Sequence, residues 1–254
     1  MKVVISPAKS LDYTTKLPLT DFTTPQFIKQ SKEVNSVLKE LSPYELKDLM
    51  RISDKLATLN WDRNQTRNFK SVELNDSTRQ ALFAFNGDVY NGLDAYSLSG
   101  SQTEYLQEHL RILSGLYGYL RPLDLMEPYR LEMGTKLPIG EANNLYSFWK
   151  NTLTNALNKE LNANDFLINL ASNEYFNVLD IKQLKAKVIT PEFKDYKENK
   201  LKTISFFAKK ARGMMVRFMA EQNLTNPEEL KLFNAEGYQF DQEMSTTTKW
   251  VFTR

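Results

Sequence analysis

The sequence LRILSGLYGYLRPLDLMEPYRLEMG, which spans residues 110–134, carries the densest mixture of structural signals in the chain. Apolar side chains are interleaved there with three glycines, two prolines and, from Arg121 onward, five charged residues. Pro122 and Pro128 lack a backbone N–H and disfavour helical geometry in the residue before them, so the path after Gly118 should be irregular but well packed. A charged loop of this length inside a compact domain is typical of a functional site.

The charges of this loop are nearly balanced, which leaves two interpretations open. Arg121 and Arg130 stand against Asp124, Glu127 and Glu132. In the first interpretation the five groups pair with one another and fix the shape of the loop, because a buried charge needs a partner. In the second, the two arginines line a cleft that binds a ligand.

Outward from this loop, the pattern indicates one compact domain over residues 1–254. The chain is 41% hydrophobic, which is enough for a substantial core, and no linker, repeat or long charge block divides it. Apolar runs that suit strands are separated by amphipathic helical segments. We therefore expect a mixed α/β fold, with a central mixed sheet surrounded by helices and a helix-hairpin-helix-like insertion near residues 42–60.

Several individual elements follow from periodicity and turn signals. Helices are predicted over residues 102–116 and 146–161, strands over 187–193 and 202–207, and an antiparallel hairpin over 238–244 and 249–253. Pro191 cannot donate a hydrogen bond within a sheet, which favours an edge position for its strand.

Composition excludes several classes of function. The sequence has no cysteine, so it forms no disulfide, thiolate metal site or thiol redox sensor. Its one histidine, His109, falls on an apolar helical stripe and should belong to the core, whereas a facial triad for ferrous iron needs two histidines. Without a signal peptide or a membrane-length apolar run, we expect a cytoplasmic protein with no cofactor, metal site, membrane contact or obligate protein partner.

Residues 42–60 carry the clearest local motif. Ser42 and Glu45 form a capping box around Pro43, which predicts the start of a helix. The helical pattern breaks near residues 50–53, and Ser53 is suited to cap a second helix. Two short helices joined by a tight turn are therefore predicted.

In DNA-binding hairpins of this type, two glycines let backbone N–H groups approach a phosphate. Here Arg51 and Ser53 replace both glycines, so side chains would have to supply the contact. Arg51 and Lys55 flank the second helix N-terminus, whose free N–H groups attract anions. Asp54 would compete with phosphate for those N–H groups, and the alternative is an ordinary helical hairpin.

Two predicted strands, residues 2–5 and 166–170, each run directly into polar side chains. The carboxyl ends of such strands are where ligands bind in sheets flanked by helices. The first strand is followed by Ser6, Lys9 and Asp12, and the second by Ser172, Asn173 and Glu174. These groups would meet in one cleft if the strands are parallel neighbours. The alternative for the first turn is a solvated loop in which Lys9 pairs with Asp12.

A helix predicted from residue 208 onward is basic on one side. With 33 basic and 31 acidic residues and a net charge of only +2, any nucleic-acid surface must come from clustered charges. Lys209, Lys210, Arg212 and Arg217 form such a cluster around Gly213, with no acid between them. The pattern favours a phosphate-bearing partner, and the alternative is a solvated basic face.

Five segments, together with residues 110–134, resemble the bacterial YaaA family of peroxide-stress proteins. They are SPAKSLDY from Ser6, LMRISDKLA from Leu49, FNGDVYNGL from Phe85, LINLASNEYF from Leu167 and ISFFAKKARG from Ile204. They occur in the family's order and cover essentially the whole chain. The resemblance implies a cytoplasmic protein that binds double-stranded and branched DNA through a helix-hairpin-helix-like element and limits free intracellular iron under peroxide stress.

Three hypotheses for function follow. The first is DNA binding that is structure-selective or nonspecific, because no recognition helix is evident and phosphate contacts carry no sequence information. The residues assigned to it are Arg51, Ser53, Lys55, Lys209, Lys210, Arg212 and Arg217.

The second hypothesis is an enzyme acting on a nucleic acid or a small phosphorylated ligand. Lys9 or Lys209 would be the nucleophile and Glu174 the acid or base. Burial of Lys9 beside Glu174 would favour this hypothesis, and exposure would count against it. The third is a direct iron binder built from the carboxylates of Asp124, Glu127 and Glu132, which we rank last.

Overall fold

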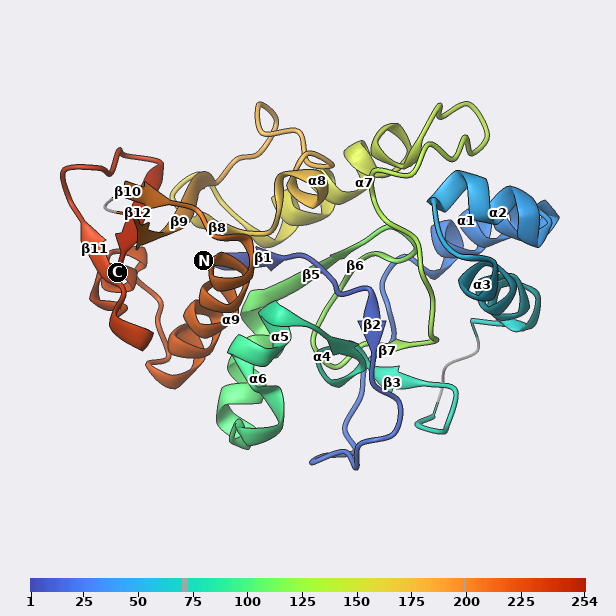
Figure 1. Ribbon diagram of the computed structural model, residues 1–254, viewed down its shortest axis with the longest axis horizontal. Coiled ribbons are helices and arrows are strands. Elements are labelled where there is room, and N and C mark those ends of the chain that lie inside the picture. Colours follow the sequence, from blue (N-terminus) through green and yellow to red (C-terminus); the bar gives the residue numbers. More distant parts are fainter. Residues whose placement is uncertain (70–72, 199) are drawn as a thin grey trace.

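The structure is a computed structural model that describes residues 1–69, 73–198 and 200–254, and a mixed sheet forms its centre (Figure 1). In this part of the chain the sheet has eight strands in the order β11-β12-β9-β8-β1-β5-β6, with β10 paired to β9. The strands are β1 (Lys2–Ile5), β5 (Leu110–Ser114), β6 (Gly118–Leu120), β8 (Phe166–Leu170), β9 (Lys187–Lys197), β10 (Lys200–Lys202), β11 (Gln239–Asp241) and β12 (Lys249–Thr253). The predicted mixed α/β architecture is confirmed.

Five neighbouring strands run parallel, in the order β5-β1-β8-β9-β12. Along the chain they occur as β1, β5, β8, β9 and β12. β5 is therefore added on one side of β1, whereas β8, β9 and β12 are added in turn on the other side. The junction between β1 and β8 is therefore a topological switch point. In open α/β sheets, ligands bind beyond the carboxyl ends of the strands at this position.

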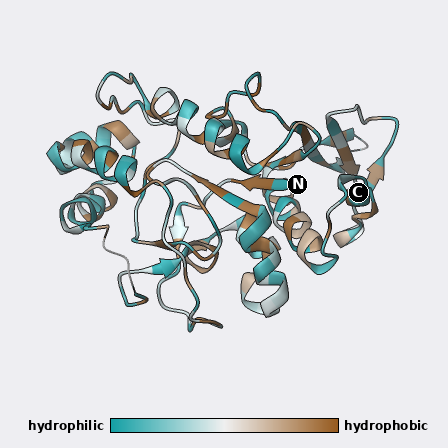
Figure 2. Ribbon diagram, turned by 180° about the vertical axis from the view of Figure 1, so that it is seen from behind, coloured by the Kyte–Doolittle hydropathy of each residue, from teal (hydrophilic) through white to brown (hydrophobic). Residues whose placement is uncertain are grey.

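Helices cover both faces of the sheet (Figure 1). On one side lie α5 (Asp88–Leu93), α6 (Gly100–His109) and α9 (Ser205–Glu221), and on the other α7 (Leu145–Glu160) and α8 (Asn173–Phe176). A separate group, formed by α1 (Ile28–Glu40), α2 (Pro43–Met50) and α3 (Asp54–Thr66), lies at the end of the molecule opposite the C-terminus. Hydrophobic residues concentrate in the central strands (Figure 2).

Short elements complete the fold. They are β2 (Ser10–Leu11) paired with β4 (Phe85–Asn86), β3 (Arg79–Gln80) paired with β7 (Leu125–Met126), α4 (Ala81–Ala84), and the 3-10 helices η1 (Ala95–Ser97), η2 (Pro227–Leu232) and η3 (Ala235–Gly237). Among the helices that the structure describes, none has the length and apolar character needed to cross a membrane.

The helix predicted over residues 102–116 is wrong in its second half. α6 ends at His109, and Leu110–Ser114 is strand β5, between β1 and β6. All five residues of β5 are buried, Arg111 and Ser114 included, so the segment lacks the alternation of a half-buried strand, and its apolar residues also fit a helical period. The pairing with β1 decides the conformation, and the periodicity alone does not show it.

Two other predictions need correction. Residues 202–207 do not form one strand, because β10 ends at Lys202 and α9 begins at Ser205. β9 is not an edge strand, since it lies between β8 and β12. Pro191 is tolerated because β8 pairs with β9 only as far as Ile189, while Thr190 donates its N–H toward Thr248 on the β12 side. Successive backbone nitrogens point to opposite sides of a strand, so the Pro191 nitrogen points toward β8, where the pairing with β9 has already ended.

Candidate functional site

The predicted pair of helices at residues 42–60 is present, and local capping produces it. Ser42 Oγ accepts from the Glu45 N–H at 3.3 Å, and the Glu45 carboxylate accepts from the Ser42 N–H at 2.8 Å, which closes the capping box of α2. α2 ends at Met50 and is followed by Arg51, whose φ of 52° is left-handed. Ser53 then caps α3 by accepting from the Leu56 N–H at 3.4 Å.

The turn between α2 and α3 carries two exposed cations, Arg51 and Lys55. Asp54 lies 2.8 Å from Lys47, so this carboxylate is engaged across the turn. Arg51 and Lys55 are exposed, and their side chains make no hydrogen bond or ion pair within the described ranges 1–69, 73–198 and 200–254. Arg51 occupies the left-handed position that a glycine takes most easily, which projects a cation from the tip of the turn.

The carboxyl ends of β1 and β8 are tied together at the switch point. Ser6 Oγ accepts from the Ser172 N–H at 2.9 Å and hydrogen-bonds the Ser172 hydroxyl at 3.2 Å. The hydroxyl of Tyr90 donates to the Ser6 carbonyl at 3.1 Å, and burial raises the pKa of this phenol, which therefore stays protonated. Ser6 and Ser172, which follow two different strands, are therefore in contact, as expected for parallel neighbours. Asn173, the next residue in the chain, is exposed.

Lys9 does not meet the condition for a catalytic lysine. Its Nζ lies 2.9 Å from Glu132, the side chain is 62% exposed, and neither Asp12 nor Glu174 is its partner. Asp12 instead accepts hydrogen bonds from Thr14 and Thr15. Burial alone would raise the pKa of Asp12, but the bonds from Thr15 and Thr14 outweigh it and lower that pKa. An exposed, paired ammonium lacks the environment that would activate it as a nucleophile.

The acidic and basic groups of the 110–134 loop divide between two ends of the sheet. Arg121 pairs with the fully buried Asp124 at 2.9 Å. It directly follows β6, which runs antiparallel to β5 and pairs its last residue, Leu120, with Ile112. Arg121 therefore lies at the amino end of the parallel strands, away from Ser6. Arg130 is at the carboxyl end, 3.4 Å from Glu132. Pairing within the loop, the first interpretation, describes both arginines.

The three carboxylates considered for iron do not converge. Asp124 pairs with Arg121, Glu127 accepts from the Phe69 N–H at 2.8 Å, and Glu132 pairs with Lys9. Over the residues that the structure describes, no group of three or more His, Cys, Asp and Glu side chains is arranged to hold a metal ion.

A cleft of about 550 Å³ lies between the α2–α3 turn and the carboxyl ends of the strands. It is lined by Asp48, Leu49, Met50, Arg51, Glu132, Gly134, Thr135, Lys136 and Glu174. Glu174 Oε1 accepts from the Gly134 N–H at 3.1 Å, and its backbone carbonyl accepts from the Tyr146 hydroxyl at 2.7 Å. Lys136 was not among the residues predicted from the sequence. The one signal for it is its position two residues after Gly134, which ends the charged loop.

The cations of α9 are engaged with nearby acids. Lys209 lies 3.8 Å from Asp88, and Lys210 pairs with Glu236. Arg217 pairs with Glu221 at 2.6 Å and also donates to the carbonyls of Leu93 and Asp94 and to Ser97. Arg212 is half-buried, and burial lowers its pKa. The predicted cluster is therefore mostly part of the contact between α9 and its neighbours.

Gly213 admits the backbone of another helix at close range, and that helix is α5. A Cβ added at Gly213 would lie 1.8 Å from the carbonyl oxygen of Val89, and one at Gly92 would lie 2.0 Å from that of Lys210. The two helices thus cross at a pair of glycines. This close approach is used for packing within the chain.

Comparison with known proteins agrees with the resemblance of the five segments. The family model described as "Peroxide stress protein YaaA" matches residues 1–244. A UPF0246 protein of Flavobacterium psychrophilum is 59% identical over 254 residues, covering 100% of both chains. UPF0246 proteins of Hahella chejuensis and Neisseria gonorrhoeae are 53% and 49% identical over 256 residues, covering 100% of this chain and 99% and 98% of theirs. The chain therefore belongs to the YaaA family of peroxide stress proteins.

Proposed function

We propose that this protein acts in the peroxide-stress response by binding the backbone of duplex and branched DNA at the α2–α3 turn. The observation that carries the proposal is the set of exposed cations Arg51, Lys55 and Lys136, whose side chains have no acidic partner in the described part of the chain. Arg51 and Lys55 flank the N-terminus of the 13-residue helix α3, where partial positive charge adds to theirs. Asp54, the local competitor for these amides, is held by Lys47.

The contact should depend on the DNA backbone and on its shape, without reading base sequence. Phosphate contacts fix the position of a protein and carry no sequence information. The four cations of α9 would contribute less than the turn, because three of them would have to exchange an existing acid partner for phosphate. We therefore assign the primary contact to Arg51, Ser53 and Lys55, and a secondary one to Lys209, Lys210, Arg212 and Arg217.

We also propose that the protein lowers oxidative DNA damage in the cytoplasm through DNA binding, and that it limits free intracellular iron, as the family resemblance implies. A protein that covers the phosphate backbone displaces the cations condensed on it. Displaced cations include any ferrous iron held there, and iron-dependent oxidation is most damaging where it occurs on the DNA itself. This route protects the DNA locally and needs no metal site in the protein, but the displaced iron joins the free pool, so displacement does not account for a lower level of free iron.

Fluorescence anisotropy tests the proposal, with labelled duplex, four-way junction and single-stranded DNA titrated over a series of salt concentrations. We expect Arg51→Glu/Lys55→Glu to weaken duplex binding at least about tenfold and to reduce the salt slope by about two, one for each phosphate contact. The matched control is Lys159→Glu/Lys182→Glu, which makes the same charge change at exposed lysines without side-chain partners in the described residues. Absence of DNA binding by the wild type near physiological salt, or an equal loss in the control, would refute the proposal.

A further inference from the structure

The lining of this cleft carries charges of both signs, with the carboxylates of Asp48, Glu132 and Glu174 against the cations of Arg51 and Lys136. Arg51 and Lys136 supply cations from the turn and from the loop opposite. Glu132 is neutralised by Lys9 at 2.9 Å and Arg130 at 3.4 Å. Among the described residues Glu174 has no cationic partner, and its side chain accepts one hydrogen bond, from the Gly134 N–H. A phosphate suits the two cations, whereas a group that donates hydrogen bonds suits Glu174.

A carboxylate is an acceptor only and offers about four lone-pair sites, of which Gly134 uses one. The ligand group that best satisfies Glu174 therefore presents two adjacent donors. Among the nucleobases only guanine does so on its Watson–Crick edge, through the ring N1–H and the exocyclic N2 amino group. Adenine and cytosine place an acceptor beside their amino donor, and thymine places an acceptor on each side of its one N–H. These acceptors would face the carboxylate oxygens.

We propose that this cleft is a binding site for a single guanine-type base, with Glu174 accepting from its N1–H and N2 amino group and Arg51 and Lys136 facing its phosphate. The cleft volume of about 550 Å³ is large enough for a nucleotide. Glu174 lies in the first turn of α8, just after β8, and the carboxyl ends of parallel strands are where open α/β sheets bind their ligands. Reading of an unpaired base by its Watson–Crick edge is a general mode of recognition for bases outside the stack.

The guanine base could come from a nucleotide extruded from DNA or from a free nucleotide, and the two sources are separable. The first source rests on the proposed DNA binding, whereas the second does not. Duplexes with one bulged guanine, inosine or thymine test the first, because a bulged base costs least to extrude. Calorimetric titration with guanosine monophosphate tests the second. Inosine lacks the N2 amino group and so removes one donor without any change to the protein.

The informative quantity is the ratio of the affinity for the guanine bulge to the affinity for the thymine bulge. We expect wild type to bind the guanine bulge roughly tenfold more tightly than the thymine bulge, within the range for one bidentate contact. The inosine bulge should lose most of this preference, and Glu174→Gln should reduce the ratio to near one. Glu141→Gln, at an exposed glutamate without a side-chain partner in the described residues, should leave it unchanged. Arg51→Glu/Lys55→Glu should weaken binding of all three duplexes and preserve the ratio.

The outcomes distinguish this inference from the proposed function. DNA binding by the wild type with equal affinity for the three bulges, together with no binding of guanosine monophosphate, overturns the base site and leaves DNA binding standing. Absence of DNA binding, with guanosine monophosphate bound and lost in Glu174→Gln, refutes the proposed function and supports the base site. A guanine preference that survives in a folded Glu174→Gln also overturns the assignment of Glu174.

Discussion

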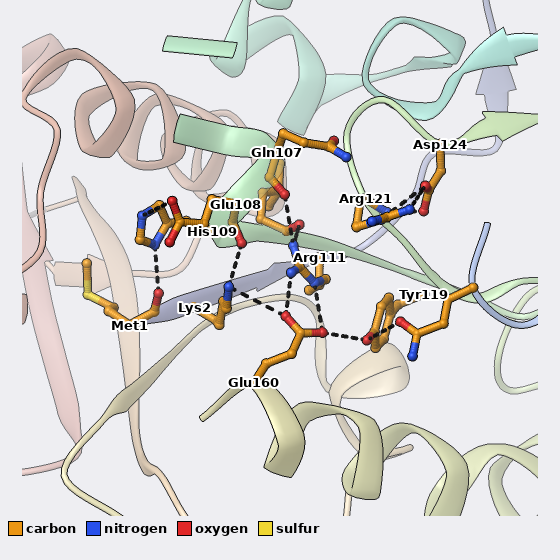
Figure 3. A network of polar contacts seen from close by, with 12 residues as sticks. Met1, Lys2, Gln107, Glu108, His109, Arg111, Tyr119, Arg121, Asp124 and Glu160 are labelled. Carbon is orange, nitrogen blue, oxygen red and sulfur yellow. Dashed lines mark hydrogen bonds and ion pairs between the residues drawn. The ribbon is translucent and has the colours of Figure 1, made fainter. Parts of the chain in front are cut away.

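Replacing Glu160 by alanine should strongly destabilise the fold, because this carboxylate neutralises two cations at the amino end of the parallel strands (Figure 3). Arg111 of β5 is only 5% exposed, and its Nε donates to Glu160 Oε1 at 3.3 Å while a second guanidinium nitrogen pairs with Oε2. Lys2 of β1 lies 3.5 Å from Oε2, and the Tyr119 hydroxyl donates to Oε1 at 2.7 Å. Removing the carboxylate leaves a buried guanidinium without a counter-charge.

The magnitude follows from what each cation retains. Breaking a buried ion pair by removing one partner costs about 3–5 kcal/mol. Arg111 keeps the carbonyls of Gln107 and Leu110 as acceptors, and Lys2 keeps that of Glu108 at 2.7 Å. We therefore expect a cost near the lower limit, about 3 kcal/mol. Glu160→Gln keeps the shape and one acceptor oxygen, so its cost should be about 1.5 kcal/mol.

The pH dependence has a defined sign. Burial alone would raise the pKa of Glu160, but hydrogen bonding to Arg111 and the charge of Arg111 outweigh it, so the folded pKa lies below the ordinary value of 4.5. A carboxyl group with a lowered folded pKa stabilises fully above its unfolded pKa and loses that contribution as the pH falls through the folded pKa. The stability difference between wild type and Glu160→Gln should be constant near neutral pH and shrink below pH 4.5.

Urea titrations followed by circular dichroism measure these differences as shifts of the midpoint at constant slope. Glu141→Gln is the control and should change stability by less than about 0.5 kcal/mol, as exposed substitutions usually do. A loss below about 1 kcal/mol for Glu160→Ala would refute the reasoning, since it would mean that Arg111 tolerates burial without its partner. DNA affinity should not change in a folded Glu160 variant, because this network and the α2–α3 turn lie at opposite ends of the parallel strands.

Two further predictions concern packing. Gly213→Ala should lower the melting temperature by forcing α5 and α9 apart, at a cost of about 1–3 kcal/mol. Gly100→Ala is the control in the same calorimetric experiment, because its added Cβ meets nothing within 4 Å. Equal melting temperatures for the two variants would contradict the close crossing of the helices. Arg254→Met should destabilise the C-terminal hairpin by about 3 kcal/mol, because the buried Asp195 keeps the Tyr238 hydroxyl at 3.1 Å but loses its cation. Tryptophan fluorescence during urea unfolding reports the latter change, and an unmoved midpoint would count against the ion pair.

The sequence allowed prediction of those elements whose ends are fixed by local chemistry. The capping box at Ser42, the cap at Ser53 and the terminal pair β11 and β12 are set by residues close together in the chain, and all are present. β5 was missed because its burial on both faces removes the alternation that marks a strand. Its pairing with β1, more than a hundred residues earlier in the sequence, is not visible in a local pattern.

The candidate site could be predicted only in outline, for a related reason. Strand ends located Ser6 and Ser172, since the position of a strand end depends on local turn signals. Partners depend on tertiary packing, so the pairing of Lys9 with Glu132 could not be predicted from sequence. The cations of α9 illustrate the same limit. A helical period shows that they share a region of the helix, but not that Glu236 and Asp94 approach it from other segments.

The two ends of the parallel strands differ in how completely their charges are satisfied, and this difference bears on where function is located. At the amino end, Glu160 is bonded to Arg111, Lys2 and Tyr119, and all its partners come from within the chain. At the carboxyl end, Glu174 and Arg51 face a cleft with no opposite charge bound to either among the described residues. Unpaired charges are ordinary on a protein surface, as at Lys159 and Glu141, and these two groups differ because both line one cleft of ligand size. A base donating to Glu174 and a phosphate against Arg51 would satisfy both at once.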